Sequence, residues 1–379
     1  MGPEGRMGLA VGVGVGGRPP APLMLAAARL FDAAGAASIW VVDHWMGLVP
    51  LELWDPQRFP AARMVRNPEE FFDPFPTLGA FSRRTRRALL GVGVTDAIRR
   101  HPAQLAQTSL TLHHLSRGRF VLGIGAGERE SIEPYGLSYE GQASRLEEAL
   151  YVIRLLWRSR DRYVSYDGRF FQLDRAIVGL GPFRRTFPPI WVAAHRPRTL
   201  RIAGRYGDGW YPTHQMEPDE YADALGAIRR AAEEAGRTLR RFTPSYDMRV
   251  LFAETHEDAH RLLDSPVLRL GALIVPAEVW AKAGATHPMG EQFHGIQDWI
   301  PSRLDAGQVE KWMDEVPFEV VHQAFDHGTW RQIGARILSY RAVGLRHAVL
   351  AQVGPLVNPR RAPASFRDAI RLIRALRSA

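Results

Sequence analysis

The stretch from Ser38 to His44 constrains the fold more than any other part of this sequence. Its apolar residues are β-branched or aromatic and do not follow helical spacing, so the stretch predicts a buried parallel strand. The polar pair Asp43 and His44 follows directly. Parallel α/β folds keep their reactive groups at the carboxyl ends of their strands. We therefore expect Asp43 and His44 to lie at a functional edge.

Three further apolar runs also end in polar or glycine-rich residues. Residues 91–94 lead into Thr95 and Asp96, residues 121–124 into Gly125-Ala126-Gly127-Glu128, and residues 190–194 into His195. Segments with helical character separate these runs. Such alternation predicts an α/β fold, a (β/α)8 TIM barrel whose polar groups gather on the rim formed by the carboxyl ends of the strands.

We expect the whole chain, residues 1–379, to form one barrel domain, because α/β barrels commonly exceed about 250 residues. Three segments interrupt the alternation. Residues 45–76 form a long loop rich in aromatic residues and prolines, residues 158–189 have the pattern of a β-hairpin excursion, and residues 263–317 lose the strand and helix rhythm. We expect the first and third segments to lie over the carboxyl-end rim.

The composition limits the classes of partner and compartment. The net charge is +9, but the positive charge is almost all arginine and is spread along the chain, so we expect an anionic small ligand and no nucleic acid. The absence of cysteine excludes disulfides and thiolate metal sites. No window is apolar enough to span a membrane, and residues 1–15 lack a signal-peptide pattern. We expect a cytoplasmic protein.

Two pairs of histidines lie close together in the sequence, and histidine is a common metal ligand. His113 and His114 have no third ligand at suitable spacing. His256 and His260 are four residues apart in a predicted helix, a spacing that suits zinc. Nothing near them in the sequence completes a site, so we expect surface histidines and no metal.

Several motifs together resemble the luciferase-like monooxygenase superfamily, and within it the branch that uses the deazaflavin coenzyme F420. These motifs are Asp43-His44, Gly93-Val94-Thr95 followed by His101-Pro102, residues 125–128, and residues 193–195 followed by 203–209. More narrowly, a smaller set of motifs is similar to the mycobacterial phthiodiolone dimycocerosate ketoreductases, which reduce a ketone on a long lipid. These motifs are Asp43-His44, residues 127–130 with 133–136, residues 287–290, and residues 297–298 with 300–301.

The resemblance implies roles for individual residues. His44 is expected to donate a proton at the reacting oxygen, with Glu128 as its partner or as the alternate acid. The Gly93-Val94 peptide is expected to be a non-prolyl cis bulge that supports the ring of the cofactor. The expected cofactor-binding residues are Asp43, Gly93, Val94, Thr95, Ala126, Gly127, Ala193, Ala194, His195 and Arg196, of which the last three precede a helix suited to binding the cofactor phosphate.

The resemblance also has departures and alternatives. Sugar-phosphate dehydrogenases of the family carry a tryptophan where Leu48 stands, and the scarcity of lysine argues further against a sugar phosphate. Arg196 replaces an expected glycine. We expect a small-molecule or lipid-like ketone substrate and, by resemblance only, a homodimer. The alternatives are an FMN-dependent monooxygenase and a non-catalytic flavin-binding barrel; the combination of Asp43, His44 and Glu128 argues against the second.

Overall fold

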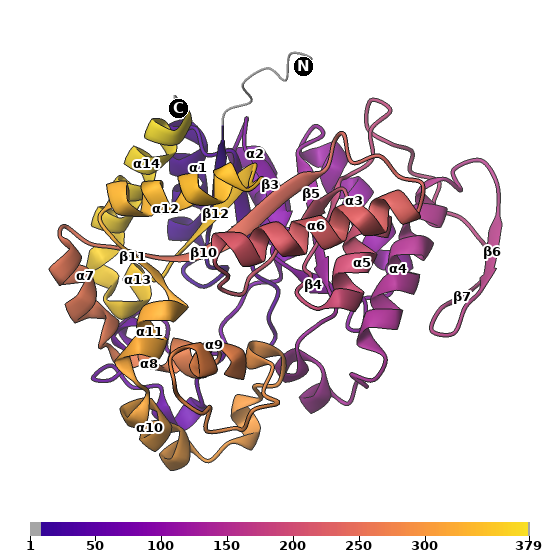
Figure 1. Ribbon diagram of the computed structural model, residues 1–379. Coiled ribbons are helices and arrows are strands. Elements are labelled where there is room, and N and C mark those ends of the chain that lie inside the picture. The colour runs from indigo at the N-terminus through magenta and orange to yellow at the C-terminus, as the bar shows by residue number, and fades with distance from the viewer. Residues whose placement is uncertain (1–8, 378–379) are drawn as a thin grey trace.

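The computed structural model describes residues 9–377; residues 1–8, which hold most of the stretch considered for a signal peptide, and residues 378–379 lie outside this range (Figure 1). Within it, eight parallel strands close into a barrel, because the last strand pairs with the first. These strands are β1 (Ala10–Gly14), β2 (Ser38–Val41), β3 (Leu89–Val92), β5 (Phe120–Gly125), β8 (Ile190–Val192), β9 (Gly209–Trp210), β10 (Thr243–Phe252) and β12 (His347–Gln352). The predicted (β/α)8 barrel is confirmed.

Helices between the strands cover the outside of the barrel and bury their apolar faces against it. They are α1 (Ala21–Ala34), α2 (Pro74–Arg84), α3 (Pro102–Leu115), α4 (Gln142–Trp157), α5 (Pro197–Tyr206), α6 (Pro218–Glu234), α12 (Trp330–Ala342) and α14 (Ala362–Arg377). The sequence reasoning missed α2, which begins inside the segment predicted to be loop. Its start is marked by Asp73, whose side chain accepts a hydrogen bond from the Phe75 amide at 2.9 Å.

Aromatic side chains fill the interior of the barrel. The ring of Trp40 on β2 packs against Trp191 on β8, with centroids 5.0 Å apart, and against Tyr211, with centroids 4.5 Å apart. Glycines on neighbouring strands make room for these rings, since a Cβ at Gly91 would collide with Trp40 and one at Gly209 with Trp191. The barrel is therefore a packed core, and its polar groups are displaced to the strand ends.

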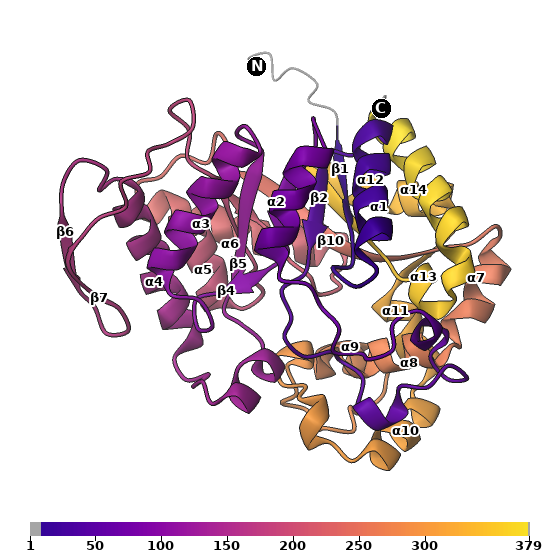
Figure 2. The same ribbon diagram turned by 180° about the vertical axis from the view of Figure 1, so that it is seen from behind.

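Two long segments meet at the end of the barrel where the strands finish (Figure 2). Residues 45–76 hold the short turns η1 (Leu51–Leu53) and η2 (Pro60–Arg63). The segment after β10 is helical. A helix was predicted around His256 and His260, but the broken pattern of residues 263–317 predicted none beyond it. Its helices are α7 (His256–Leu263), α8 (Pro266–Leu273), α9 (Ala277–Lys282), α10 (Ala306–Glu315) and α11 (Phe318–Ala324). The Trp299 indole donates to the Leu48 carbonyl at 2.8 Å, so the two segments pack on each other.

Four short strands lie outside the eight-stranded barrel order. β6 (Val164–Asp167) and β7 (Gln172–Ala176) form an antiparallel hairpin that projects from one side of the molecule (Figure 1). β4 (Thr95–Asp96) continues the path of β3 and pairs with β5, while β11 (Asp326–Gly328) pairs with the end of β10. Among residues 9–377, no helix combines the length and apolar character needed to cross a bilayer.

Hydrogen bonds to Asp32 connect α1 to the segment that leads into β3. Its buried carboxylate accepts hydrogen bonds from the backbone amides of Arg86, Arg87 and Ala88 at 2.8 to 2.9 Å. Burial opposes the charged form, but these bonds outweigh it and lower the pKa of Asp32. We expect Asp32→Ala to reduce the free energy of unfolding by about 3 kcal/mol, measured by urea denaturation, because three buried donors lose their acceptor.

The exposed Asp223 provides the control for this substitution. Asp223→Ala should change the free energy of unfolding by less than about 0.5 kcal/mol. Because the folded-state pKa of Asp32 is depressed, the difference between the two variants should shrink as the pH falls through that pKa. Equal urea midpoints for both variants at neutral pH would contradict this account.

Candidate active site

Asp43 lies just past the end of β2 and is held by two arginines. Its carboxylate is 2% exposed and lies 3.4 Å from Nη1 of Arg99 and 3.2 Å from Nη2 of Arg100. Burial alone would raise the pKa of Asp43, but the charges of Arg99 and Arg100 outweigh burial and lower it. Asp43 is therefore an anion at neutral pH, and its carboxylate fixes the loop that follows β4.

Arg99 links Asp43 to a second carboxylate. Its Nε lies 2.5 Å from Oδ2 of Asp96, and its Nη2 donates to the Asp43 carbonyl at 2.8 Å. Asp96 in turn accepts from the backbone amides of Ile98 and Arg99 at 2.8 and 2.7 Å. All three charged side chains are almost fully buried, so the ends of β2 and β4 are fastened to each other by ion pairs.

His44 meets two glutamates that follow β5. Its Nδ1 donates to Oε1 of Glu130 at 3.2 Å and lies 3.5 Å from Oε2 of Glu128. The side chain of Glu130 is 0% exposed, and that of Glu128 is 31% exposed. The structure thus brings together the two residues predicted to act in catalysis. It also adds Glu130, which the sequence reasoning missed because nothing in the sequence distinguishes it from the helical glutamates nearby.

The pKa values of His44 and Glu128 depend on their neighbours in this cluster. Burial would lower the pKa of His44, but its hydrogen bond to Glu130 and the charges of both glutamates raise it. Burial and the charge of Glu130 raise the pKa of Glu128 to about 8. The surroundings thus favour the protonated forms of both His44 and Glu128. With a pKa of about 8, Glu128 holds a proton at neutral pH.

A pH series should expose the proton on Glu128. Its folded-state pKa of about 8 lies above the ordinary value of 4.5, so between these limits the folded protein keeps a proton that the unfolded chain has lost. The natural protein should therefore lose stability relative to Glu128→Gln as the pH rises through this window, and the difference should level off above it. Urea denaturation at about pH 5, 7 and 9 measures this. Glu291→Gln, at an exposed position, is the control; a flat difference for Glu128→Gln would contradict the account.

The predicted ring-supporting residues lie on neighbouring strands. The peptide bond between Gly93 and Val94 is cis. A Cβ added at Gly125 would lie 3.2 Å from Val94 Cγ2 and 3.3 Å from Ala193 Cβ, so the end of β5 meets the residues that follow β3 and β8. Thr95 is buried on β4 beside this point.

Ala126 and Gly127 connect β5 to Glu128. Gly127 has a φ of +95°, a left-handed conformation that favours glycine, and a Cβ there would crowd Ile132. This turn directs Glu128 back toward His44, at 3.5 Å.

His195 lies past the end of β8, after Ala194. Its ring stacks on His214 with centroids 3.9 Å apart, and its Nε2 lies 3.4 Å from the Thr213 amide. Its Nδ1 is buried without a hydrogen-bond partner among the described residues. Burial and the charges of Arg196 and Arg249 lower the pKa of His195 to about 3, so the imidazole is neutral.

Arg196 is placed differently from the rest of the predicted set. It precedes α5, but its side chain is exposed and its Nη1 lies 2.6 Å from Oε1 of Glu278 on α9. The guanidinium thus joins the helical segment over the rim to the start of α5. Its positive charge remains near the helix terminus, where an anion would bind.

Two charged residues on β10 were also missed. Asp247 and Arg249 alternate with the buried Tyr246 and Met248, a period of two that the sequence displays. Burial raises the pKa of Asp247 to about 7, although the charge of Arg249 opposes this. Burial also lowers the pKa of Arg249. The charges of Asp247 and Glu128 act in the opposite direction but do not outweigh burial. Arg249 therefore lies close enough to Glu128 and Asp247 for their charges to interact.

Residues 6–347 match the family described as luciferase-like monooxygenase, which is most of the chain. The chain belongs to this family. Among its curated members, the phthiodiolone/phenolphthiodiolone dimycocerosates ketoreductase of Mycobacterium tuberculosis (strain H37Rv) is 41% identical over 343 residues, covering 90% of this chain and 89% of that protein. The F420-dependent glucose-6-phosphate dehydrogenase of Nakamurella multipartita is 32% identical over 292 residues, covering 75% and 81%.

Solved structures of luciferase-like proteins share the fold of this family member. An F420-dependent secondary alcohol dehydrogenase in complex with an F420-acetone adduct superposes with a TM-score of 0.75 at 19% identity, covering 98% of this chain and 99% of the other. The coenzyme F420-dependent tetrahydromethanopterin reductase of Methanopyrus kandleri gives 0.71 at 18% identity, covering 97% of each chain. At these identities the likeness supports the barrel architecture alone.

The residues at the rim of this luciferase-like barrel fit a flat cofactor with an anionic tail. Gly125, Ala126, Gly127, Ala193 and Ala194 leave little side-chain bulk at the ends of β5 and β8. The unpartnered Nδ1 of His195 offers a polar contact. The helix that begins just beyond it, α5, presents backbone amides suited to phosphate.

Proposed function

We propose that this chain is an F420-dependent oxidoreductase that transfers a hydride between C5 of the deazaflavin and a carbonyl or alcohol carbon, and that it reduces a ketone on an apolar, lipid-like substrate. The observation that carries the proposal is the cluster of His44, Glu128 and Glu130 at the carboxyl-end rim. The identity of 41% to a named ketoreductase and of 32% to a named F420-dependent dehydrogenase supports the reaction class.

Reduced F420, when bound, supplies a hydride from its C5 carbon. The protein must then hold the carbonyl near that carbon and protonate the developing alkoxide. His44 is suited to this because its two glutamate partners favour its protonated form, and Glu128, whose Oε2 lies 3.5 Å from Nδ1, carries a second proton. Glu130 is fully buried beside Nδ1, so it orients the imidazole and stabilises its positive charge. The residues predicted to bind cofactor lie on the same rim, and we propose this role for them.

An apolar substrate is favoured by the groups around His44. The ring of Phe71 lies 5.5 Å from the imidazole, centroid to centroid. Trp45, which is 39% exposed, packs edge-on against Tyr135 with centroids 4.8 Å apart. These aromatic side chains border the proposed proton donor, so an alkyl chain that enters over them would shield the reacting carbonyl from water.

The test compares two cofactors and two classes of ketone. Purified protein is titrated with F420 and with FMN, and turnover is followed with reduced F420 and either a long-chain ketone or a small polar one. We expect F420 binding and faster turnover of the long-chain ketone. Tight FMN binding with oxygen consumption would favour a monooxygenase instead, and activity confined to small polar carbonyls would overturn the substrate proposal.

We also propose a homodimer and a cytoplasmic location, on the resemblance and the composition respectively. Light scattering after size exclusion tests the first, and fractionation of the native host tests the second. A monomer at micromolar concentration, or recovery outside the cytoplasm, would contradict these proposals.

A further inference from the structure

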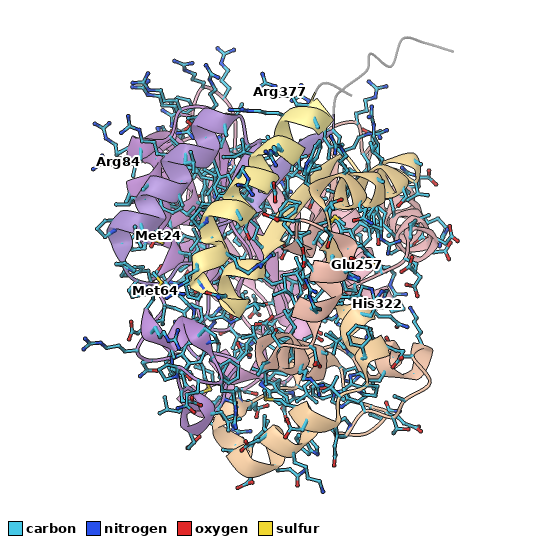
Figure 3. All side chains as sticks on the ribbon, turned by 90° about the vertical axis from the view of Figure 1, so that its left-hand side faces the viewer. Met24, Met64, Arg84, Glu257, His322 and Arg377 are labelled. Carbon is cyan, nitrogen blue, oxygen red and sulfur yellow. The ribbon has the colours of Figure 1, made fainter. Side chains whose placement is uncertain are left out.

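Four histidines converge at a place separate from the active site, where α7, α11 and β11 meet. Figure 3 labels Glu257 on α7 and His322 on α11, which mark the two helices of this cluster. The histidine cluster consists of His256, His260, His322 and His327. The sequence showed nothing near His256 and His260 that could complete a site, but β11 brings His327 beside them from far along the chain.

The spacing of three members suits one ion. Ligand nitrogens of His256, His260 and His327 all lie within 4.8 Å of one another. His256 and His260 are one helical turn apart on α7, so they point from the same face, and their ring centroids are 4.6 Å apart. His327 faces both, with centroids 5.7 and 5.3 Å away. Small side-chain rotations would bring three nitrogens to a common centre.

His327 is already oriented as a ligand. Its Nδ1 donates to the Phe325 carbonyl at 2.9 Å, which leaves the lone pair on Nε2. That Nε2 is buried and has no hydrogen-bond partner among the described residues. A backbone carbonyl that fixes the tautomer of an imidazole is the usual support of a metal-bound histidine. The lone pair of Nε2 is therefore available to bind a metal ion.

His322 also packs against this group of histidines, with its ring centroid 5.1 Å from that of His260. The ring of His322, 4.4 Å from that of His327, closes one side of the cluster.

We propose that His256, His260 and His327 bind a divalent transition-metal ion of the zinc class. Three imidazole ligands suit Zn²⁺, Co²⁺, Ni²⁺ or Cu²⁺, whereas Mg²⁺ and Ca²⁺ require oxygen ligands. The ion joins α7 to β11 and leaves a coordination position open beside His322. This site lies on other elements than His44, Glu128 and Glu130, so it is independent of the proposed ketone reduction.

The test uses the full-length protein without a polyhistidine tag. Co²⁺ is titrated while its visible absorption is followed, and Zn²⁺ is then added as a competitor. We expect one equivalent of Co²⁺ that Zn²⁺ displaces. His327→Ala and His256→Ala should each weaken binding at least about tenfold, because even the loss of an outer partner costs that much. His294→Ala, which removes a histidine paired with Asp298 elsewhere, is the matched control and should bind as the natural protein does.

His256 is exposed, so its variant keeps the test valid even where His327→Ala disturbs β11. His44→Ala distinguishes the two candidate sites, because His44, Glu128 and Glu130 also have ligand atoms within 4.8 Å of one another. Binding that survives in His256→Ala and His327→Ala, or that is lost in His44→Ala, would overturn the proposal. An unfolding midpoint that rises with Zn²⁺ in the natural protein and not in His256→Ala would support it.

Discussion

Replacing His44 with alanine should lower kcat for the proposed F420-linked ketone reduction by about 10²- to 10⁴-fold, because the reaction would lose its proposed proton donor. The imidazole is held by Glu130 at 3.2 Å and shares its proton environment with Glu128. Stopped-flow measurement of F420H₂ oxidation gives the rate, and fluorescence titration gives the cofactor Kd. We expect the Kd to change little, since the substitution removes a group assigned to the transferred proton.

A companion variant makes this result specific. Glu130→Gln keeps the shape of the side chain but removes the charge that raises the pKa of His44. It should shift the alkaline limb of the pH–rate profile to lower pH, because His44 then loses its proton more readily. His294→Ala is the control for the loss of a histidine. A His44→Ala enzyme with unchanged kcat, or one whose rate loss matches its loss of cofactor affinity, would rule out His44 as the proton donor.

Arg99→Ala should reduce the free energy of unfolding by about 3 to 5 kcal/mol, because it leaves two buried carboxylates without their shared cation. The Arg99 side chain is 3% exposed and lies between Asp43 and Asp96, each 2% exposed. Chemical denaturation measures the change. The expected loss is a large share of the stability of a typical domain, so the variant should also unfold at a much lower temperature.

Arg58 offers a matched control, because it pairs with Glu310 at the surface, where both side chains are partly exposed. Arg58→Ala should cost less than about 1 kcal/mol, since exposed ion pairs contribute little. Similar costs for Arg58→Ala and Arg99→Ala would show that the buried network is not what fastens β2 to β4.

Local sequence predicted the strands that carry the site, because each is a short apolar run that ends in polar residues. The family resemblance named Glu128 as the partner of His44, and the two side chains lie 3.5 Å apart. Glu130 and the pairing of Asp43 with Arg99 were not predicted, because they depend on how the loops after β2, β4 and β5 fold back. Sequence periodicity does not record such contacts.

Long-range assembly explains the other differences. The segment of residues 263–317 is mostly short helices of 6 to 10 residues, too brief to show a clear period, so its helices α8, α9 and α10 were missed. The third histidine of the histidine cluster was missed because β11 is only three residues long. In both cases tertiary packing, rather than local propensity, decides the structure.

The segments over the rim share an apolar interior of their own. Leu53 and Phe59 from the first segment are buried with Leu273, Trp299 and Val309 from the second, apart from the barrel core. If only one of these two segments were replaced by the corresponding segment of a relative, the two would no longer pack closely. The apolar side chains between them would then be exposed to water. Chimeras designed to alter substrate preference therefore need to transplant both segments together, while the barrel beneath can be kept unchanged.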